Sequence, residues 1–400
     1  MNISNWSTGK YSQYFHNNQM IMDDNNKLYK SSKPSNTIYD KVLEYLDSKY
    51  DIRFNSIALD YEITVKKEKD WSILNLNSLL IELTKTGIDI PVSKLEILIK
   101  SDWILNYNPL EQYFKNLKKW DENNNYIKQF ASYVTTNDND AWYYHLEKWL
   151  VRAVLCALEK DKINKHCIVL ANGDQNCGKT TYFRFFIPDK LSAYISEDIG
   201  VDKDSRVKLC TNFILNLDEL SLMGKTDINS LKAFFSKTTV NERLPYQKKA
   251  TLLNRICSFV GSSNLTDFLT DETGNVRWIV FDVKGRINFN YSKEINIDDV
   301  WSQAYFLAYE RKNYNPELTL NDVAENEIRN ERYASLSIEQ EMVITYYEKS
   351  QEQLDFRTAT DIVKELYPLG LKINREKIGR ALAGFKYTRQ KIVKDRFMVI

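Results

Sequence analysis

The sequence predicts an α/β core, preceded by a small, mainly helical domain and followed by a domain that resembles a winged helix. Three observations lead to this fold class. A chain of 400 residues is too long for one ordinary hydrophobic core, so two or three domains are expected. In the middle of the chain, a glycine-containing turn joins an apolar, strand-like run to a helix-like stretch. The end of the chain has the pattern of three helices and two short strands.

The composition is that of a globular protein whose overall charge is balanced. Apolar residues make up 43% and charged residues 27%, and the net charge is +1, so any nucleic-acid surface must be local. The five cysteines form no C-x-x-C pair and there are only three histidines. We therefore expect neither a zinc site nor a disulfide framework, which fits a reducing cytoplasm.

The first residues lack the basic and apolar regions of a signal peptide. Apolar runs in the chain also stay well short of membrane-spanning length. We therefore expect a cytoplasmic protein with no membrane partner.

The N-terminal part divides into a flexible arm and a small domain. Residues 1–35 are polar and rich in Asn and Ser, which predicts a weakly structured arm. Residues 36–135 should form the mainly helical domain. Its expected elements are helices at 39–50, 76–84 and 92–99 and a strand or short hairpin at 56–66. The second and third helices fit either a DNA-contacting helix-turn-helix or an ordinary helical linker.

The core is expected over residues 136–334, after a long amphipathic helix that begins near residue 140. Its main motif follows the apolar run 166–171 and fits the pattern G-x-x-x-x-G-K-[ST] of a phosphate-binding loop. The motif consists of Gly173, Asp174, Gln175, Asn176, Cys177, Gly178, Lys179, Thr180 and Thr181.

The loop residues have distinct expected roles toward a nucleoside triphosphate, which we take to be ATP. Gly173 and Gly178 let the backbone curl so that its N–H groups face the phosphates. Lys179 should reach the β- and γ-phosphates, and Thr180 should hold Mg²⁺. The helix that follows presents its positive N-terminal end to the same anion.

Two further apolar runs end in polar residues that suit hydrolysis. The run 213–217 ends in Asp218 and Glu219. We expect the first acid to hold Mg²⁺ and the second to polarise the attacking water. The run 259–263 ends in Asn264, which can bond the γ-phosphate or that water. Arg277 stands just before another strand-like run and could reach a neighbouring subunit's γ-phosphate as an arginine finger.

Residues 239–250 have the pattern of strand, turn and strand, with Arg243, Lys248 and Lys249 in or near the turn. Such a basic hairpin can grip the phosphates of single-stranded DNA. An ordinary solvated hairpin has the same pattern.

The last domain, residues 335–400, is expected to contain helices at 338–349, 359–366 and 375–383 and strands at 386–390 and 396–400. Residues 372–396 include nine Lys/Arg and two Asp/Glu. This basic density favours contact with nucleic acid over a purely structural role.

These motifs, in this order, resemble the virulence-associated protein E family, which is related to the superfamily III helicases, ring-forming AAA+ ATPases. The resemblance covers about residues 126–282. It includes the phosphate loop, the Asp-Glu strand, the basic hairpin, the Gly-Ser-Ser-Asn strand and the segment Phe-Leu-Thr-Asp-Glu-Thr-Gly-Asn-x-Arg. It implies nucleotide binding by Lys179 and Thr180, metal binding and hydrolysis by Asp218 and Glu219, and a sensor at Asn264.

The resemblance also implies that Arg277 is the arginine finger. One position departs from the family pattern Gly-Asn-Arg-Arg, because Val276 stands where the first arginine is usual. Some relatives carry a primase, but the region before the core lacks a convincing cluster of primase acids.

The resulting hypothesis is a helicase or translocase of a phage or mobile element, working as a ring of identical subunits that we expect to be a hexamer. It would use ATP and Mg²⁺ to move single-stranded or forked DNA, in contact with host replication proteins. The alternative is an ATP-switched DNA-binding initiator or defence-related protein without unwinding activity. A small-molecule kinase fits less well, because it gives Asn264 and Arg277 no role.

Overall fold

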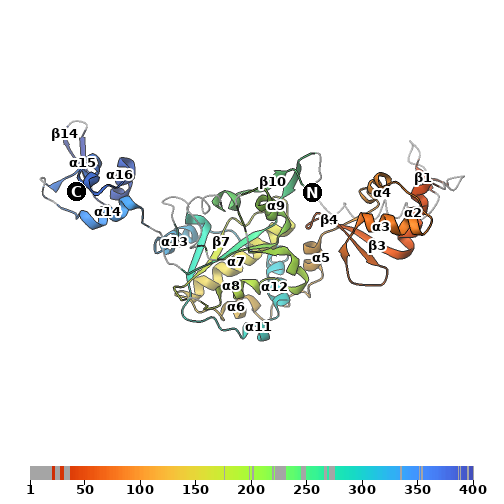
Figure 1. The fold of residues 1–400 in the computed structure, drawn as a ribbon. Helices are drawn as coiled ribbons and strands as arrows, with labels where there is room; N and C mark the ends of the chain where they lie inside the picture. The colour runs from red at the N-terminus through yellow and green to blue at the C-terminus, as the bar shows by residue number, and fades with distance from the viewer. Residues whose placement is uncertain are drawn as a thin grey trace.

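The computed structural model describes three successive parts of the chain (Figure 1). The residues it describes are 37–174, 176–197, 199–200, 202–218, 220, 231–244, 249–264, 268–269, 275–333, 336–350, 352, 355–385 and 387, and, for the backbone alone, 20–22, 28–30, 389–393 and 396–399. The arm predicted at residues 1–35 therefore lies outside the described residues, apart from the short antiparallel pair β1 (Met20–Met22) and β2 (Leu28–Lys30).

The middle part is a mixed α/β unit, as predicted. Its strands are β7 (Cys167–Ala171), β8 (Ile195–Ser196), β9 (Ile214–Leu217), β10 (Thr239–Glu242), β11 (Thr251–Asn254), β12 (Ser258–Ser263) and β13 (Trp278–Asp282). Its helices are α5 (Pro109–Lys115), α6 (Tyr126–Ala131), α7 (Asn139–Leu158), α8 (Lys179–Arg184), α9 (Lys203–Thr211), α11 (Tyr291–Glu294), α12 (Ile297–Tyr309) and α13 (Leu320–Glu331), with short 3-10 turns η1 (Asp189–Tyr194) and η3 (Asn275–Arg277).

Five of these strands form a parallel sheet in the order β13-β7-β12-β9-β8. The strand β12 is inserted between β7 and β9, so the segments after these three strands meet at one edge of the sheet. The chain leaves β7 toward β8 on one side and later returns to β13 on the other. This reversal makes the carboxyl edge beside β7 the expected ligand site of an open parallel sheet.

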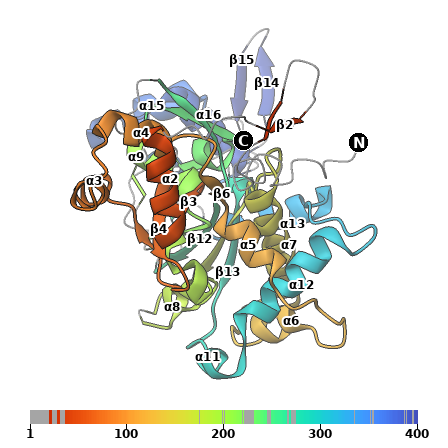
Figure 2. The same ribbon diagram turned by 90° about the vertical axis from the view of Figure 1, so that its right-hand side faces the viewer.

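Both faces of the sheet are covered, since every residue of β7, β9 and β12 is buried. Alternate residues of β7 belong to different cores: Ile168 and Leu170 pack with α7, α8 and α12, whereas Val169 packs with α9. Figure 2 shows α7 and α12 on one side of the strands and α9 on the other. The helix α7 also supports the sheet directly, since the indole N–H of Trp149 donates to the carbonyl of Phe259, at 3.1 Å.

The N-terminal part is less helical than the sequence predicts. It contains the helices α2 (Ile38–Lys49), α3 (Leu76–Lys85) and α4 (Val92–Ile99), whose bounds lie within one residue of those expected. It also contains a four-stranded sheet of β3 (Tyr50–Asn55), β4 (Asp60–Val65), β5 (Ser72–Ile73) and β6 (Leu105–Tyr107). The sequence pattern predicts only a strand or short hairpin at 56–66, a range that contains β4 but not β3. The strands β5 and β6 are two and three residues long and carry no periodic signal.

The boundary between the N-terminal part and the core falls earlier than predicted. The hydrophobic core of the N-terminal part spans residues 42–104, whereas α5 and α6 pack into the core of the central part. Their buried residues include Leu110, Phe114 and Phe130. The central part therefore begins near residue 108 rather than at 136.

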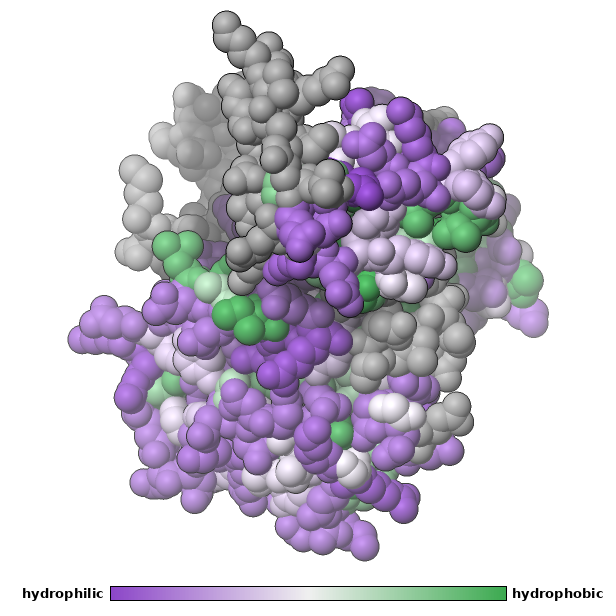
Figure 3. All heavy atoms as spheres, turned by 90° about the vertical axis from the view of Figure 1, so that its left-hand side faces the viewer, coloured by the Kyte–Doolittle hydropathy of each residue, from purple (hydrophilic) through white to green (hydrophobic). Residues whose placement is uncertain are grey.

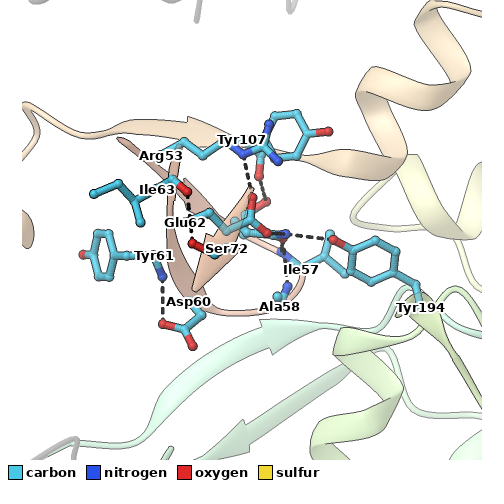
Figure 4. Close-up of polar contacts among 12 residues, drawn as sticks. Arg53, Ile57, Ala58, Asp60, Tyr61, Glu62, Ile63, Ser72, Tyr107 and Tyr194 are labelled. Carbon is cyan, nitrogen blue, oxygen red and sulfur yellow. Dashed lines mark hydrogen bonds and ion pairs between the residues drawn. The ribbon is translucent and has the colours of Figure 1, made fainter. Parts of the chain in front are cut away.

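One polar contact joins the two parts (Figure 4). The Asn55 amide, only 1% exposed at the end of β3, donates to the Tyr194 hydroxyl at 2.7 Å and to Glu62 at 2.6 Å. The Arg53 guanidinium reaches the same carboxylate at 2.6 Å and lies between the rings of Trp71 and Tyr107. Because the Asn55 contact is buried, it fixes the N-terminal sheet against the segment that leads into β8.

The last part contains α14 (Ile338–Tyr346), α15 (Ala359–Leu366), the 3-10 turn η5 (Tyr367–Leu369), α16 (Arg375–Gly384) and the antiparallel pair β14 (Arg389–Val393) and β15 (Arg396–Val399). The helices enclose a small core of their own that includes Val343, Ile362 and Ile378. The face of the molecule on this side is mainly hydrophilic, with small, separate hydrophobic spots (Figure 3). Among the described helices, none combines the length and apolar character needed to cross a membrane.

Candidate functional site

Of the two glycines expected to let the loop after β7 curl, Gly178 has a left-handed backbone and Gly173 does not. Gly178 has φ +101°, in the left-handed region, and Asn176 also has positive φ, at +60°. The Asn172 side chain accepts a hydrogen bond from the Asp174 N–H at 2.6 Å and so fixes the first turn of the loop. The helix α8 begins directly after Gly178, at Lys179. Gln175 lies outside the described residues.

Lys179 is buried at the centre of the carboxyl edge, only 5% exposed. Its ammonium group donates to the Asn264 side-chain oxygen at 2.9 Å and lies 3.3 Å from the Asn172 carbonyl. These partners are neutral, and within the described part of the chain Lys179 has no ion pair. A buried ammonium group whose partners are neutral is a strong site for an anion.

A second group of oxygen atoms lies beside the lysine. The Thr180 hydroxyl donates to Asp218 at 2.7 Å, and the Ser262 hydroxyl donates to the same carboxylate oxygen at 2.6 Å. The two hydroxyls are 3.4 Å apart. One carboxylate with hydroxyl neighbours is the kind of donor set that binds Mg²⁺ together with substrate phosphates. Among the described residues, no group of three or more His, Cys, Asp or Glu forms a fuller metal cage.

The structure thus brings together Lys179, Thr180, Asp218 and Asn264, which are four of the residues singled out in the sequence. Lys179 and Thr180 begin α8 directly after the loop, whereas Asp218 and Asn264 follow β9 and β12. Because β12 lies between β7 and β9, Asn264 lies between the other two segments. Glu219 lies outside the described residues, so its predicted role as the water-activating acid stays a prediction. Of the other loop residues, Gly173, Asp174, Asn176 and Thr181 are exposed, whereas Cys177 is buried.

Arg277 is not part of this cluster. It ends η3 and directly precedes β13, whose first residue Trp278 pairs with Cys167 at the start of β7. Arg277 therefore lies at the amino edge of the sheet, whereas the phosphate-binding loop lies at the carboxyl edge. It is partly exposed, and its Nε donates to the Ser236 hydroxyl at 3.2 Å.

An antiparallel pair is present, but only its first strand β10 lies within the predicted range 239–250, because β11 begins at Thr251. Arg243 and Lys249 are exposed near its turn, whereas Lys248 lies outside the described residues. The helix α9 holds the hairpin from one side, because Arg206 pairs with Glu242 at 2.6 Å and Lys203 donates to the Arg243 carbonyl.

Three residues near the site were not singled out in the sequence: Asn172, Ser262 and Phe289. Asn172 could have been found, because it directly follows an apolar strand run, and Ser262 because a serine inside a buried strand needs a polar partner. Phe289 could not, because it is distant in sequence from the loop that it contacts. A Cβ atom added to Gly178 would lie 2.6 Å from its ring.

Gly178→Ala should therefore destabilise the protein for two reasons, a strained φ and a clash with Phe289. We expect a loss of about 3 kcal/mol or more in the free energy of unfolding. Gly285→Ala is the matched control, because Gly285 has φ +69° but no atom within 4 Å of its added Cβ. Denaturant unfolding measures the free energy of unfolding of both variants. Equal losses of this free energy in the two variants would show that the Phe289 contact does not constrain the loop.

Comparisons with known proteins identify a family and a similar fold. A family model described as the virulence-associated protein E-like domain matches residues 114–335, which is more than half of the chain. The apo structure of the NrS-1 C-terminal region (305–718) is similar, with a TM-score of 0.52 and 14% identity over 91% of this chain and 98% of that chain. An A form apo structure of the same region has a TM-score of 0.50 and 15% identity, with the same coverage of both chains. At these identities the likeness is one of fold. A search of curated proteins gives no match.

Proposed function

We propose that this chain, which belongs to the virulence-associated protein E-like family, is a Mg²⁺- and ATP-dependent DNA helicase or translocase that works as a ring in the replication of a phage or mobile element. The observation that carries the proposal is the convergence of Lys179, Asp218 and Asn264 at one sheet edge. The Lys179 ammonium group lies 2.9 Å from the Asn264 side-chain oxygen, and Asp218 accepts a hydrogen bond from the Thr180 hydroxyl at 2.7 Å.

Each residue has a defined task in hydrolysis under this proposal. The Lys179 ammonium group would exchange its neutral partners for the β- and γ-phosphates of ATP. The oxygens of Thr180 and Asp218 would hold Mg²⁺, which neutralises charge on the phosphates. The Asn264 amide, released from the lysine, would orient the attacking water, and Glu219 would polarise it.

The position of Arg277 supports a ring. This residue lies at the edge of the sheet opposite its own phosphate-binding loop, so under this proposal it acts on another subunit's nucleotide rather than on its own. The site at the carboxyl edge would then be completed by a neighbour, as in ATPases that carry out hydrolysis at subunit interfaces. A closed ring of identical subunits, each using the same interface, satisfies this arrangement.

The basic hairpin is the proposed grip on single-stranded DNA. Lys248→Ala combined with Lys249→Ala should leave the basal ATPase rate unchanged but remove its stimulation by DNA. The salt slope of DNA binding should fall by about one for each lysine that no longer neutralises a phosphate.

Fluorescence anisotropy over a series of salt concentrations measures the slope of DNA binding against salt. Lys118→Ala with Lys119→Ala is the control, since these two lysines are adjacent in the sequence and exposed. An unchanged salt slope in the hairpin variant would exclude this hairpin as the element that binds single-stranded DNA.

We assign the last part of the chain to DNA or partner recruitment, as a winged-helix-like domain. The helix α16 follows an exposed Lys372 and itself carries exposed Arg375 and Lys377. These cations suit contacts with DNA phosphates. Host replication proteins are further candidate partners of this domain.

Strand displacement from a forked DNA, together with DNA-stimulated ATP hydrolysis, tests the proposal as a whole. A helicase should separate the strands only with hydrolysable ATP and Mg²⁺. DNA binding that depends on ATP without any strand separation would instead favour an ATP-switched initiator or defence-related protein.

A further inference from the structure

The segment that follows β13 runs along the phosphate-binding loop. Near its start, the Asn172 amide donates to the Val283 carbonyl at 2.8 Å. Further on, the Ile287 N–H donates to the Cys177 carbonyl at 2.9 Å. Residues 283–289 are therefore attached to the phosphate-binding loop near both of its ends.

This segment lies on the flank of the loop that faces away from the hydrolytic residues. In the sheet order β13-β7-β12-β9-β8, the strand β13 lies on one side of β7, and the strands that carry Asn264 and Asp218 lie on the other. The γ-phosphate end of a bound nucleotide belongs on the side of Asn264 and Asp218, because the loop backbone cradles the α- and β-phosphates and its lysine reaches the β and γ. The nucleoside end must then extend toward the opposite flank, where residues 283–289 lie.

Arg286 on this segment is exposed. Its guanidinium carbon lies 5.3 Å from the centre of the Phe289 ring, and the edge of that ring contacts Gly178. Arg286 has no ion pair within the described part of the chain. Lys284, by contrast, is paired with Asp282 at 2.6 Å. A guanidinium group backed by an aromatic ring is suited to stack on a second flat group, such as a nucleobase.

We infer that Arg286, supported by Phe289, stacks on the base of the nucleotide held by the phosphate-binding loop. The inference rests on the proposed function, since it assigns the nucleoside half of the same site. Phe289 is a positioning residue in this arrangement. It holds the guanidinium group on one side and the Gly178 turn on the other, so the two halves of the site keep a fixed spacing.

Binding of MgATP and of magnesium tripolyphosphate, measured by calorimetry on the full chain, tests the inference without any activity assay. Tripolyphosphate has the phosphates but no base. Arg286→Ala should weaken ATP binding about tenfold, the size of effect expected when one stacking interaction is removed, and leave tripolyphosphate binding unchanged. Arg286→Lys should behave like the alanine variant toward ATP, because lysine keeps the charge but lacks the planar face. Lys293→Ala, an exposed cation on α11, is the control and should match the wild type.

The outcomes separate this inference from the function on which it rests. Equal weakening of ATP and tripolyphosphate would place Arg286 on the phosphates and overturn the stacking assignment. Full ATP affinity in Arg286→Ala would overturn it as well, with the proposed function intact. A wild-type chain that binds neither compound would overturn the proposed function and the inference with it.

Discussion

Lys179→Ala should reduce ATP hydrolysis by about 10²- to 10³-fold and weaken nucleotide binding, the largest effect expected of any change on the carboxyl edge of the sheet. Lys179 is only 5% exposed, and among the described residues its hydrogen-bond partners are neutral. No other described cation lies at the centre of the loop. The phosphates would therefore lose their main side-chain partner.

The variant should fold, because an alanine replaces a buried ammonium group that has no ion pair in the described part of the chain. The Asn264 amide loses one partner and becomes accessible to water from the site. Circular dichroism and the unfolding temperature check that the structure is kept. Lys190→Ala is the matched control, since Lys190 has a side chain 75% exposed and should retain wild-type turnover.

Steady-state phosphate release and binding of a fluorescent ATP analogue measure the two effects separately. Wild-type turnover in Lys179→Ala would contradict the assignment of residues 173–181 to phosphate binding. Normal binding with lost turnover would restrict the lysine to the hydrolytic step.

The sequence predicted the parts of the site that depend on local chemistry. A left-handed backbone favours glycine, and Gly178 does have a positive φ, whereas Gly173 does not. Buried strands require continuous apolar runs, which located β7, β9, β12 and β13 within one or two residues of their observed bounds. Ser262 was missed because it lies inside the strand rather than after it, although a serine inside a buried strand also needs a polar partner.

What the sequence could not predict depends on contacts between distant segments. The insertion of β12 between β7 and β9 is what joins Asn264 to Lys179, and no periodic pattern carries a strand order. The same holds for Phe289 against Gly178, more than 100 residues apart in the chain. The boundary near residue 108 was missed because α5 and α6 look like any short amphipathic helices until their partners in the core are known.

Arg277→Ala should retain ATP binding, and its rate of ATP hydrolysis should fall by about 10³-fold or more. This is the size of effect typical of an arginine finger. The strand β13 separates Arg277 from the carboxyl edge of its own sheet. Its five residues, Trp278–Asp282, span about 16 Å at the usual rise of a strand. A side chain at the amino edge therefore cannot reach the phosphate-binding loop of its own chain, and any direct contact with a γ-phosphate must be made with a neighbour's nucleotide.

A purely structural role for Arg277 makes a different prediction. The described contact of its side chain within the chain is the 3.2 Å hydrogen bond to Ser236, while the carbonyl of Asn275 in the same turn accepts from Asn330 at 2.8 Å. Ser236→Ala removes the first contact and leaves the guanidinium group in place. It should keep most of the wild-type hydrolysis. If Ser236→Ala is as inactive as Arg277→Ala, the arginine acts by holding η3 and not as a finger.

Mixing Arg277→Ala protein with Lys179→Ala protein gives the decisive measurement. In a mixed ring, some interfaces pair an intact phosphate-binding loop of one subunit with an intact Arg277 of the next, and neither variant alone can form such an interface. At equal amounts roughly one interface in four is complete, so up to about a quarter of the wild-type rate should return. Co-assembly is checked by size-exclusion chromatography with differently labelled subunits. Mixed rings that form and never hydrolyse ATP would show that Arg277 does not act across the interface, because every other requirement for turnover is then present in the same ring.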